Sequence, residues 1–151
     1  MSELFLPDAA ATDALGARLA QALPARAVVH LHGDLGAGKS SLARALLRAL
    51  GVIGTIRSPT YTLVEPYPLP AGGTALHLDL YRIGDPGELE FLGLDPDAAR
   101  LWLVEWPQRG RGALPPPDLD IRLALQGAGR VCTLEAQTPA GRAWLAQAGL
   151  E

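Results

Sequence analysis

The clearest chemical signal in this chain is a glycine-rich segment, Gly33-Asp34-Leu35-Gly36-Ala37-Gly38-Lys39-Ser40. It fits the pattern G-x-x-x-x-G-K-[ST], in which glycines let backbone N–H groups surround phosphate oxygens without a clashing side chain. In such a loop Lys39 reaches the β- and γ-phosphates of a nucleoside triphosphate, and the Ser40 hydroxyl binds Mg²⁺. The segment therefore predicts a nucleotide-binding loop rather than an ordinary glycine-rich turn.

The sequence on either side of this segment supports the same interpretation. An apolar, β-rich run over Val28–His32 precedes the glycines, and Lys39–Leu50 has apolar residues at helical spacing. A helix that begins here points the positive end of its dipole at the phosphates. Lys39 is also the only lysine among the 13 lysines and arginines of the chain. A compact ammonium and a planar guanidinium are not interchangeable at such a site.

The absence of certain residue types indicates which nucleotide base the loop would accept. GTPases usually recognise guanine with an Asn-Lys-x-Asp segment, but the sequence has no asparagine and no second lysine. ATP, together with Mg²⁺, is therefore the expected ligand.

Two acidic residues at the ends of predicted strands are candidates for metal binding and for the activation of water. Glu105 ends the apolar strand predicted over Leu101–Glu105, where a P-loop site needs an acid that holds Mg²⁺ directly or through water. Asp79 and His77 share one face of the strand predicted over Thr74–Tyr81, because side chains alternate along a strand. Asp79 would hold the metal's water or orient the attacking water, while His77 is expected to be structural. Ordinary solvent-exposed acids are the alternative at both positions.

The order of the predicted elements indicates the class of fold. Strands alternate with helices early in the chain and a hairpin follows late, which favours an α/β fold with strands in both directions. We expect a P-loop NTPase-like, three-layer α/β/α arrangement around a mixed central sheet, in a single ATPase domain over residues 1–151. The other expected elements are helices over Ala10–Leu23 (capped near its start by Thr12), after Gly87 through Leu92 and over Pro139–Leu150, and strands over Thr60–Tyr67, Asp118–Leu125 and Arg130–Ala136.

Composition and charge argue against several other functions. The formal net charge is −3 and no block of like charges occurs, so autonomous binding to nucleic acid or to a membrane surface is not expected. The sequence has no run of about 18 apolar residues and no signal-peptide pattern. Cys132 is the only cysteine, which excludes a disulfide within the chain and fits a reducing compartment. We therefore expect a cytoplasmic protein without membrane association, in which Cys132 is a core residue.

Four segments, in their order and spacing, closely resemble the bacterial TsaE (YjeE) family, and the resemblance extends over nearly the whole chain. The glycine loop alone is generic, whereas its combination with S-P-T-[FY], H-x-D-L-Y-R and V-E-W-P is specific. The four segments are Gly33–Leu42, Ser58–Val64, His77–Arg82 and Leu103–Pro107. The resemblance implies an ATPase that helps to make threonylcarbamoyladenosine in tRNA, together with the proteins TsaB and TsaD. TsaD would carry the transfer chemistry, and tRNA would be contacted indirectly, through the complex.

The resemblance also implies roles for individual residues. Lys39, Asp79 and Glu105 match the family's catalytic positions, and Ser40 and Glu105 match its magnesium ligands. Ser40 replaces the more usual threonine but keeps the hydroxyl. Gln108 stands where the family often has an acid, so no essential chemistry is assigned to it. The nucleotide is expected between the loop and an N-terminal element, at Thr12, Gly33, Leu35, Gly36, Ala37, Gly38, Lys39, Ser40, Ser41 and Arg130.

Other interpretations stay open on the sequence alone. A small-molecule kinase would use the same loop, with Arg109 and Arg111 in a short lid, and would transfer phosphate to a metabolite instead of water. A non-hydrolysing adaptor would use ATP only to stabilise a shape for a partner. The sequence offers no convincing arginine finger, so we expect low ATPase activity that a partner raises. For Thr12 and Arg130, a helix cap and a surface charge are the alternative interpretations.

Overall fold

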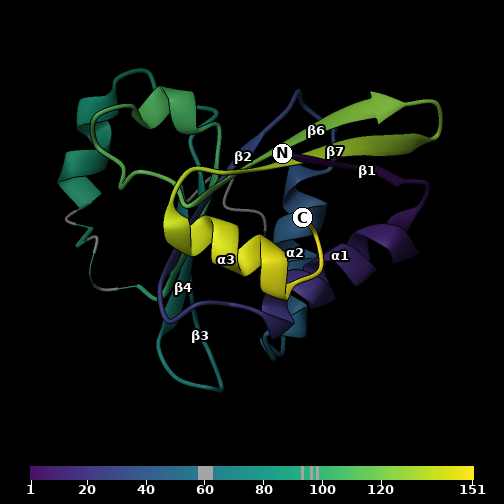
Figure 1. The fold of residues 1–151 in the computed structure, drawn as a ribbon. Helices are drawn as coiled ribbons and strands as arrows, with labels where there is room; N and C mark the ends of the chain where they lie inside the picture. The colour runs from purple at the N-terminus through teal and green to yellow at the C-terminus, as the bar shows by residue number, and fades with distance from the viewer. Residues whose placement is uncertain (58–62, 93, 96, 98) are drawn as a thin grey trace.

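The described residues form one seven-stranded mixed sheet (Figure 1). A computed structural model describes residues 1–57, 63–92, 94–95, 97 and 99–151. The strands lie in the order β1-β7-β6-β2-β5-β4-β3. The β6–β2, β2–β5 and β5–β4 pairs are parallel, and the β1–β7, β7–β6 and β4–β3 pairs are antiparallel. The elements are β1 (Ser2–Leu6), α1 (Ala9–Gln21), β2 (Ala27–His32), α2 (Lys39–Ala49), β3 (Val64–Pro68), β4 (Thr74–Asp79), the 3-10 helix η1 (Pro86–Leu92), β5 (Leu101–Glu105), the 3-10 helix η2 (Pro107–Gly110), β6 (Leu119–Gln126), β7 (Gly129–Ala136) and α3 (Pro139–Gln147).

The α-helices of the described residues share one face of the sheet. All three contribute side chains to a core that includes Leu103 of β5 and Ile121 of β6. A second core on the other face, around Leu78 and Val104, is closed by η1 and by the chain near η2. The expected α/β fold with a mixed sheet is confirmed, and the layer opposite the α-helices consists of 3-10 helices and connecting segments. Each described helix is too short or too polar to cross a lipid bilayer.

The sequence patterns place most elements correctly but miss the first strand. β1 lies at the sheet edge and pairs antiparallel with β7, and its few residues mix polar and apolar side chains without a clear pattern. The strand expected over Thr60–Tyr67 is seen as β3, and its expected residues 60–62 lie outside the described ranges. β4 ends at Asp79 rather than Tyr81, because the Asp79 carboxylate accepts a hydrogen bond from the Tyr81 N–H at 3.0 Å and the chain turns there.

The N-terminal cap of α1 is Asp8, so the prediction that Thr12 caps this helix is wrong. Asp8 has extended backbone angles, with φ −155° and ψ 179°, and its side chain accepts a hydrogen bond from the N–H of Ala11 at 2.9 Å. This is the geometry of an N-cap residue, which must precede the first helical turn. Thr12 lies inside that turn and lines a cavity beside the glycine loop.

The close packing of α1 on α2 gives a first testable prediction. A Cβ added at Gly16 would lie 2.8 Å from the backbone carbon of Ala45. Alanine favours a helix over glycine by about 1 kcal/mol, but overpacking against backbone costs up to about 3 kcal/mol. We therefore expect Gly16→Ala to lower the free energy of unfolding, measured in urea, by about 2 kcal/mol.

The control for this experiment is Gly84→Ala, because a Cβ added at Gly84 would meet only a side-chain atom of Glu88 at 3.7 Å. We expect this control to change the free energy of unfolding by less than about 0.5 kcal/mol. Equal stability of the two variants would contradict the predicted clash between α1 and α2.

Candidate nucleotide-binding site

The glycine loop connects β2 to α2, as the sequence predicts. Gly33, Gly36 and Gly38 have φ angles of 148°, 78° and 108°, a region that residues with side chains rarely adopt. At Gly33, an added Cβ would also lie only 2.5 Å from the backbone oxygen of Leu123. Gly38 precedes α2 without a side-chain cap, which leaves the first N–H groups of this helix available to bind an anion.

Lys39 is folded over the carbonyl groups of its own loop. Its Nζ donates hydrogen bonds to the backbone oxygens of Gly33 at 2.6 Å and Asp34 at 2.9 Å. The residue as a whole is 4% exposed. Burial lowers the pKa of Lys39, and the nearby carboxylates of Glu105, Asp79 and Asp34 oppose this effect. The ammonium therefore lies inside the site with acidic side chains around it.

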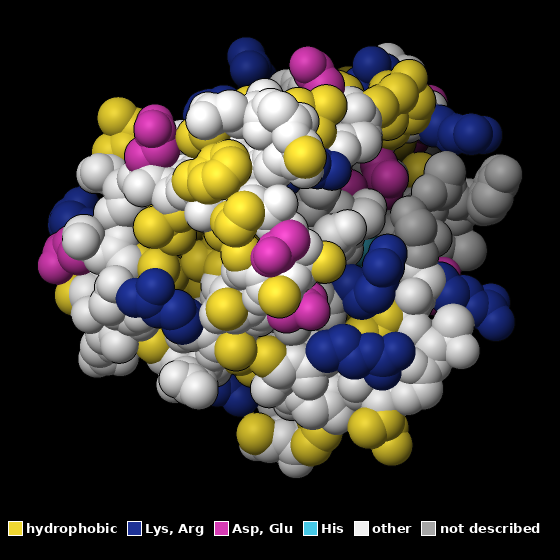
Figure 2. All heavy atoms as spheres, turned by 90° about the vertical axis from the view of Figure 1, so that its right-hand side faces the viewer, with side chains coloured by type: hydrophobic (Ala, Val, Ile, Leu, Met, Phe, Trp, Pro, Cys, Tyr) yellow, Lys and Arg dark blue, Asp and Glu magenta, His cyan; other side chains and the backbone are white. Residues whose placement is uncertain are grey.

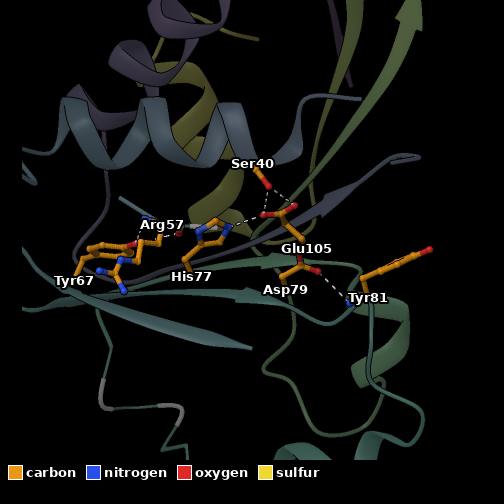
Figure 3. Close-up of polar contacts among 7 residues, drawn as sticks. All are labelled: Ser40, Arg57, Tyr67, His77, Asp79, Tyr81 and Glu105. Atoms are coloured by element: carbon orange, nitrogen blue, oxygen red, sulfur yellow. Dashed lines mark hydrogen bonds and ion pairs between the residues drawn. The ribbon is translucent and has the colours of Figure 1, made fainter. Parts of the chain in front are cut away.

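Ser40, Glu105 and His77 form a chain of polar contacts that Figure 3 shows from α2 to β4. The Ser40 hydroxyl donates to the Glu105 carboxylate, with Oγ 2.9 Å from Oε2 and 3.0 Å from Oε1. On its other side, Oε2 lies 2.6 Å from Nε2 of His77. The side chains of His77 and Glu105 are only 2% and 3% exposed. The predicted metal ligands Ser40 and Glu105 are thus brought into direct contact.

Asp79 lies beside Glu105 because β4 and β5 pair in parallel with these two residues in register. Burial raises the pKa of the Asp79 carboxyl, the hydrogen bond from the Tyr81 N–H lowers it, and the neighbouring Glu105 raises it again. The predicted pair of acids therefore occupies one end of the sheet, next to Lys39.

The raised pKa of Asp79 predicts a pH-dependent cost to the stability of the nucleotide-free protein. Below the ordinary pKa of 3.8 the carboxyl is protonated in both the folded and the unfolded state, so the cost is absent. As the pH rises through the higher folded-state pKa, the folded protein acquires a half-buried charge that the unfolded chain keeps in water. Asp79→Asn removes this charge and keeps an acceptor for the Tyr81 N–H. We therefore expect the variant to be more stable than the wild type at pH 8.

Urea denaturation in EDTA between pH 4 and pH 8 measures this difference. The gain in the free energy of unfolding should shrink as the pH falls toward 4. Asp85→Asn is the matched control, because exposed Asp85 makes the same kind of turn, accepting the Gly87 N–H at 2.9 Å. A gain for Asp79→Asn that is the same at every pH would contradict a charge effect.

Nearly all of the predicted site residues line one or both of two adjoining cavities. A cavity of about 390 Å³ lies over the start of α2, and one of about 650 Å³ lies between α1, α2 and the β6–β7 hairpin. Gly38, Ser41 and Arg130 line both. Gly33 lines neither and instead accepts the hydrogen bond from Lys39. The predicted residues that line one or both cavities are Thr12, Leu35, Gly36, Ala37, Gly38, Lys39, Ser40, Ser41, Asp79, Glu105 and Arg130.

A pair of aromatic rings, tilted by 50° to each other, lies at the smaller cavity. Trp106 has a left-handed backbone, with φ 57° and ψ 50°, and its ring centroid lies 4.6 Å from Nζ of Lys39. The Tyr81 ring lies 5.0 Å from the Trp106 ring, and the Arg109 guanidinium lies 5.3 Å from the Tyr81 ring. Arg109, which a kinase would use in a lid, therefore lies at cation–π distance from these rings.

Sequence reasoning missed several residues of the two cavities. Arg44 and Arg48 line the larger cavity, and Tyr81 and Arg82 line the smaller one. Arg44 lies three residues after Ser41 and Arg48 lies four residues after Arg44, a spacing that places all three on one face of a helix. This spacing was the signal that could have assigned them to the site. The Ser58–Val64 motif lies mostly outside the described residues, so the structure does not place it.

Comparison with known proteins decides the family. The sequence model described as "Threonylcarbamoyl adenosine biosynthesis protein TsaE" matches residues 6–147. The chain belongs to the TsaE family. It is 44% identical over 117 residues to the tRNA threonylcarbamoyladenosine biosynthesis protein TsaE of Haemophilus influenzae, covering 76% of this chain and 73% of that protein. It is 47% identical over 115 residues to the TsaE of Synechocystis sp., covering 71% of each chain.

A solved structure supports the same assignment at the level of the fold. The crystal structure of Bacillus subtilus YdiB superposes with a TM-score of 0.75 and 25% sequence identity, covering 97% of this chain and 93% of the other. Proteins of the TsaE family take part in tRNA threonylcarbamoyladenosine biosynthesis, as the family description and the names of the relatives state. The family resemblance inferred from the four motifs is therefore confirmed.

Proposed function

We propose that this TsaE-family protein is a Mg²⁺-dependent ATPase that supports the formation of threonylcarbamoyladenosine in tRNA. The observation that carries the proposal is the convergence of Lys39, Ser40, Asp79 and Glu105 on one cavity at the start of α2. This set supplies a cation for the phosphates, oxygen ligands for a metal and a second acid for water. Phosphoryl transfer to water needs these components in one place.

The two adjoining cavities suit the two ends of ATP. The triphosphate would occupy the smaller cavity, against the N–H groups at the start of α2, and the adenosine would occupy the larger one beside Thr12. A volume of about 650 Å³ is within the usual range for a ligand of this size. On binding, phosphate oxygens would replace the two loop carbonyls as acceptors for Lys39.

The residues present also fit magnesium. Mg²⁺ prefers oxygen ligands and usually takes only one or two from the protein, with phosphates and water completing its shell. The Ser40 hydroxyl and the Glu105 carboxylate, which touch each other, are such ligands. When bound, the ion neutralises phosphate charge during transfer. Asp79, in register with Glu105, would orient the attacking water.

In this proposal TsaB and TsaD raise the ATPase activity in the cytoplasm, and tRNA is contacted through their complex. On the face drawn in Figure 2, Lys and Arg side chains are interspersed with Asp, Glu and hydrophobic side chains. With a net charge of −3, long-range attraction of the isolated protein for tRNA phosphates is weak. Indirect contact with tRNA fits this distribution of charge.

Phosphate release from ATP, measured for the protein alone and with TsaB and TsaD, tests the proposal. We expect slow release by the isolated protein and at least about tenfold faster release with both partners, because partners often complete such sites. Equal turnover with and without the partners would contradict their part in hydrolysis. Transfer of labelled phosphate to a metabolite instead of water would favour a small-molecule kinase.

Arg130 is expected to bind the nucleotide because it lines both cavities and its Nη2 lies 3.4 Å from the backbone oxygen of Gly36. Arg130→Ala should weaken ADP binding about tenfold, which is the loss of one hydrogen bond to a charged group. Titration calorimetry measures this affinity. The matched control is Arg122→Ala, since Arg122 lies on the neighbouring strand and its side chain faces the other side of the sheet from Leu123. If both variants bind ADP equally well, Arg130 is only a surface charge.

A further inference from the structure

His77 contacts the site without lining its cavities. The residue is fully buried, and it is not among the described residues that line the two cavities. Its side chain shares a face of β4 with Asp79 and reaches Glu105 on the neighbouring strand (Figure 3). The hydrogen-bonded contact between His77 and the lining of the smaller cavity is the one to Glu105.

The hydrogen-bond partners of Glu105 indicate which atom carries the imidazole proton. The carboxylate accepts the Ser40 hydroxyl, and its Oε2 lies 2.6 Å from Nε2 of His77. Among the described residues, Nδ1 of His77 is buried and has no hydrogen-bond partner. A neutral imidazole has a single N–H, and only at Nε2 does that N–H find an acceptor. His77 thus donates to Oε2 of Glu105.

We propose that His77 is a positioning residue that fixes the Glu105 carboxylate for Mg²⁺. By donating a hydrogen bond to Oε2, His77 fixes the orientation of the carboxylate plane. Oε1 and the Ser40 hydroxyl oxygen then remain available to bind the metal. The inference rests on the proposed function, because it assumes that Glu105 is a metal ligand. Hydrogen bonds of this kind orient the residues that bind metals, and their loss typically weakens metal binding 10- to 100-fold.

Two amide substitutions separate a hydrogen bond at Nε2 from simple packing. The amide nitrogen of a glutamine reaches about as far along the side chain as Nε2 of histidine, whereas that of an asparagine reaches only about as far as Nδ1. His77→Gln therefore keeps a donor for Glu105, and His77→Asn offers a donor of the same kind at the wrong position. His77→Leu fills a similar volume without any donor.

The measurement is ADP binding by titration calorimetry, in EDTA and across a series of Mg²⁺ concentrations, with thermal unfolding of each variant as a check on folding. Mg²⁺ should raise the affinity for ADP, and the Mg²⁺ concentration that gives half of this increase is the quantity compared. We expect this concentration to be at least about tenfold higher for His77→Asn and His77→Leu than for the wild type. His77→Gln should stay within about threefold of the wild type. Binding of ADP in EDTA should be the same in all four proteins.

Each other outcome overturns the inference. Equal Mg²⁺ requirements in all variants would mean that Glu105 needs no positioning by His77. Equal impairment of the Gln and Asn variants would mean that the imidazole only packs, and loss of ADP binding in EDTA would mean a structural defect. A different result would contradict the proposed function itself: binding of ADP by the wild-type protein that does not depend on Mg²⁺.

Discussion

Lys39→Ala is expected to lower the rate of ATP hydrolysis by at least about 100-fold, with or without TsaB and TsaD, which is the typical cost of removing one preorganised donor to a developing charge. Lys39 lines the smaller cavity, and the present partners of its Nζ are the loop carbonyls of Gly33 and Asp34. The variant leaves the β- and γ-phosphates without this cation. Phosphate release and the formation of modified tRNA, measured side by side, would record the loss.

Two further variants sharpen this prediction. Lys39→Arg keeps the charge but places a planar group where Trp106 and the loop enclose a compact ammonium, so we expect it to be impaired as well. Arg26→Ala removes a cation that pairs with Asp97 on the surface, and it should leave turnover unchanged. If Lys39→Ala retained a tenth or more of the wild-type rate, the assignment of this lysine to the phosphates would be wrong.

Glu105→Gln is expected to lower Mg²⁺-dependent hydrolysis by about 100-fold or more, because a charged metal ligand becomes a neutral amide. The amide keeps nearly the same volume, and its oxygen still accepts the Ser40 hydroxyl. Glu105→Ala should lose hydrolysis and also stability, by about 1–3 kcal/mol because buried His77 is left without its hydrogen-bond partner. Phosphate release and urea denaturation measure the two effects, and exposed Glu3→Gln on β1 is the control for both.

The same variant separates hydrolysis from a purely structural use of ATP. If Glu105→Gln lost hydrolysis but supported tRNA modification at the wild-type rate with TsaB and TsaD, the protein would act as a non-hydrolysing adaptor. Loss of both activities together would support the ATPase proposal. Normal hydrolysis by Glu105→Gln would contradict the role of Glu105 as a metal ligand.

The glycine loop was predictable from the sequence because its signal is local. Glycines, a lysine and a hydroxyl at fixed spacing specify one backbone conformation between a strand and a helix, and Gly36 and Gly38 adopt the positive φ angles that this conformation requires. The alternation of His77 and Asp79 with the leucines of β4 is local as well, and it placed both polar residues on the correct face.

Local sequence patterns gave wrong predictions in two situations. In one, two nearby residues could both cap a helix; in the other, a strand forms only because it pairs with another strand. Asp8 caps α1 because its backbone is extended and its carboxylate reaches Ala11, and the sequence alone did not rank it above Thr12. β1 forms because it pairs antiparallel with β7 at the edge of the sheet. Its five residues have no regular pattern that would predict this pairing.

The sequence by itself determined the glycine loop, the strand–loop–helix unit that presents it, and the motifs of the TsaE family. Only the tertiary structure decided that Glu105 meets Ser40, 65 positions away, and His77, 28 positions away. These contacts depend on the register of β4 beside β5 and of β2 beside β5. Register is set by packing across the whole sheet, because a slip of one residue would turn every side chain of a strand to the opposite face.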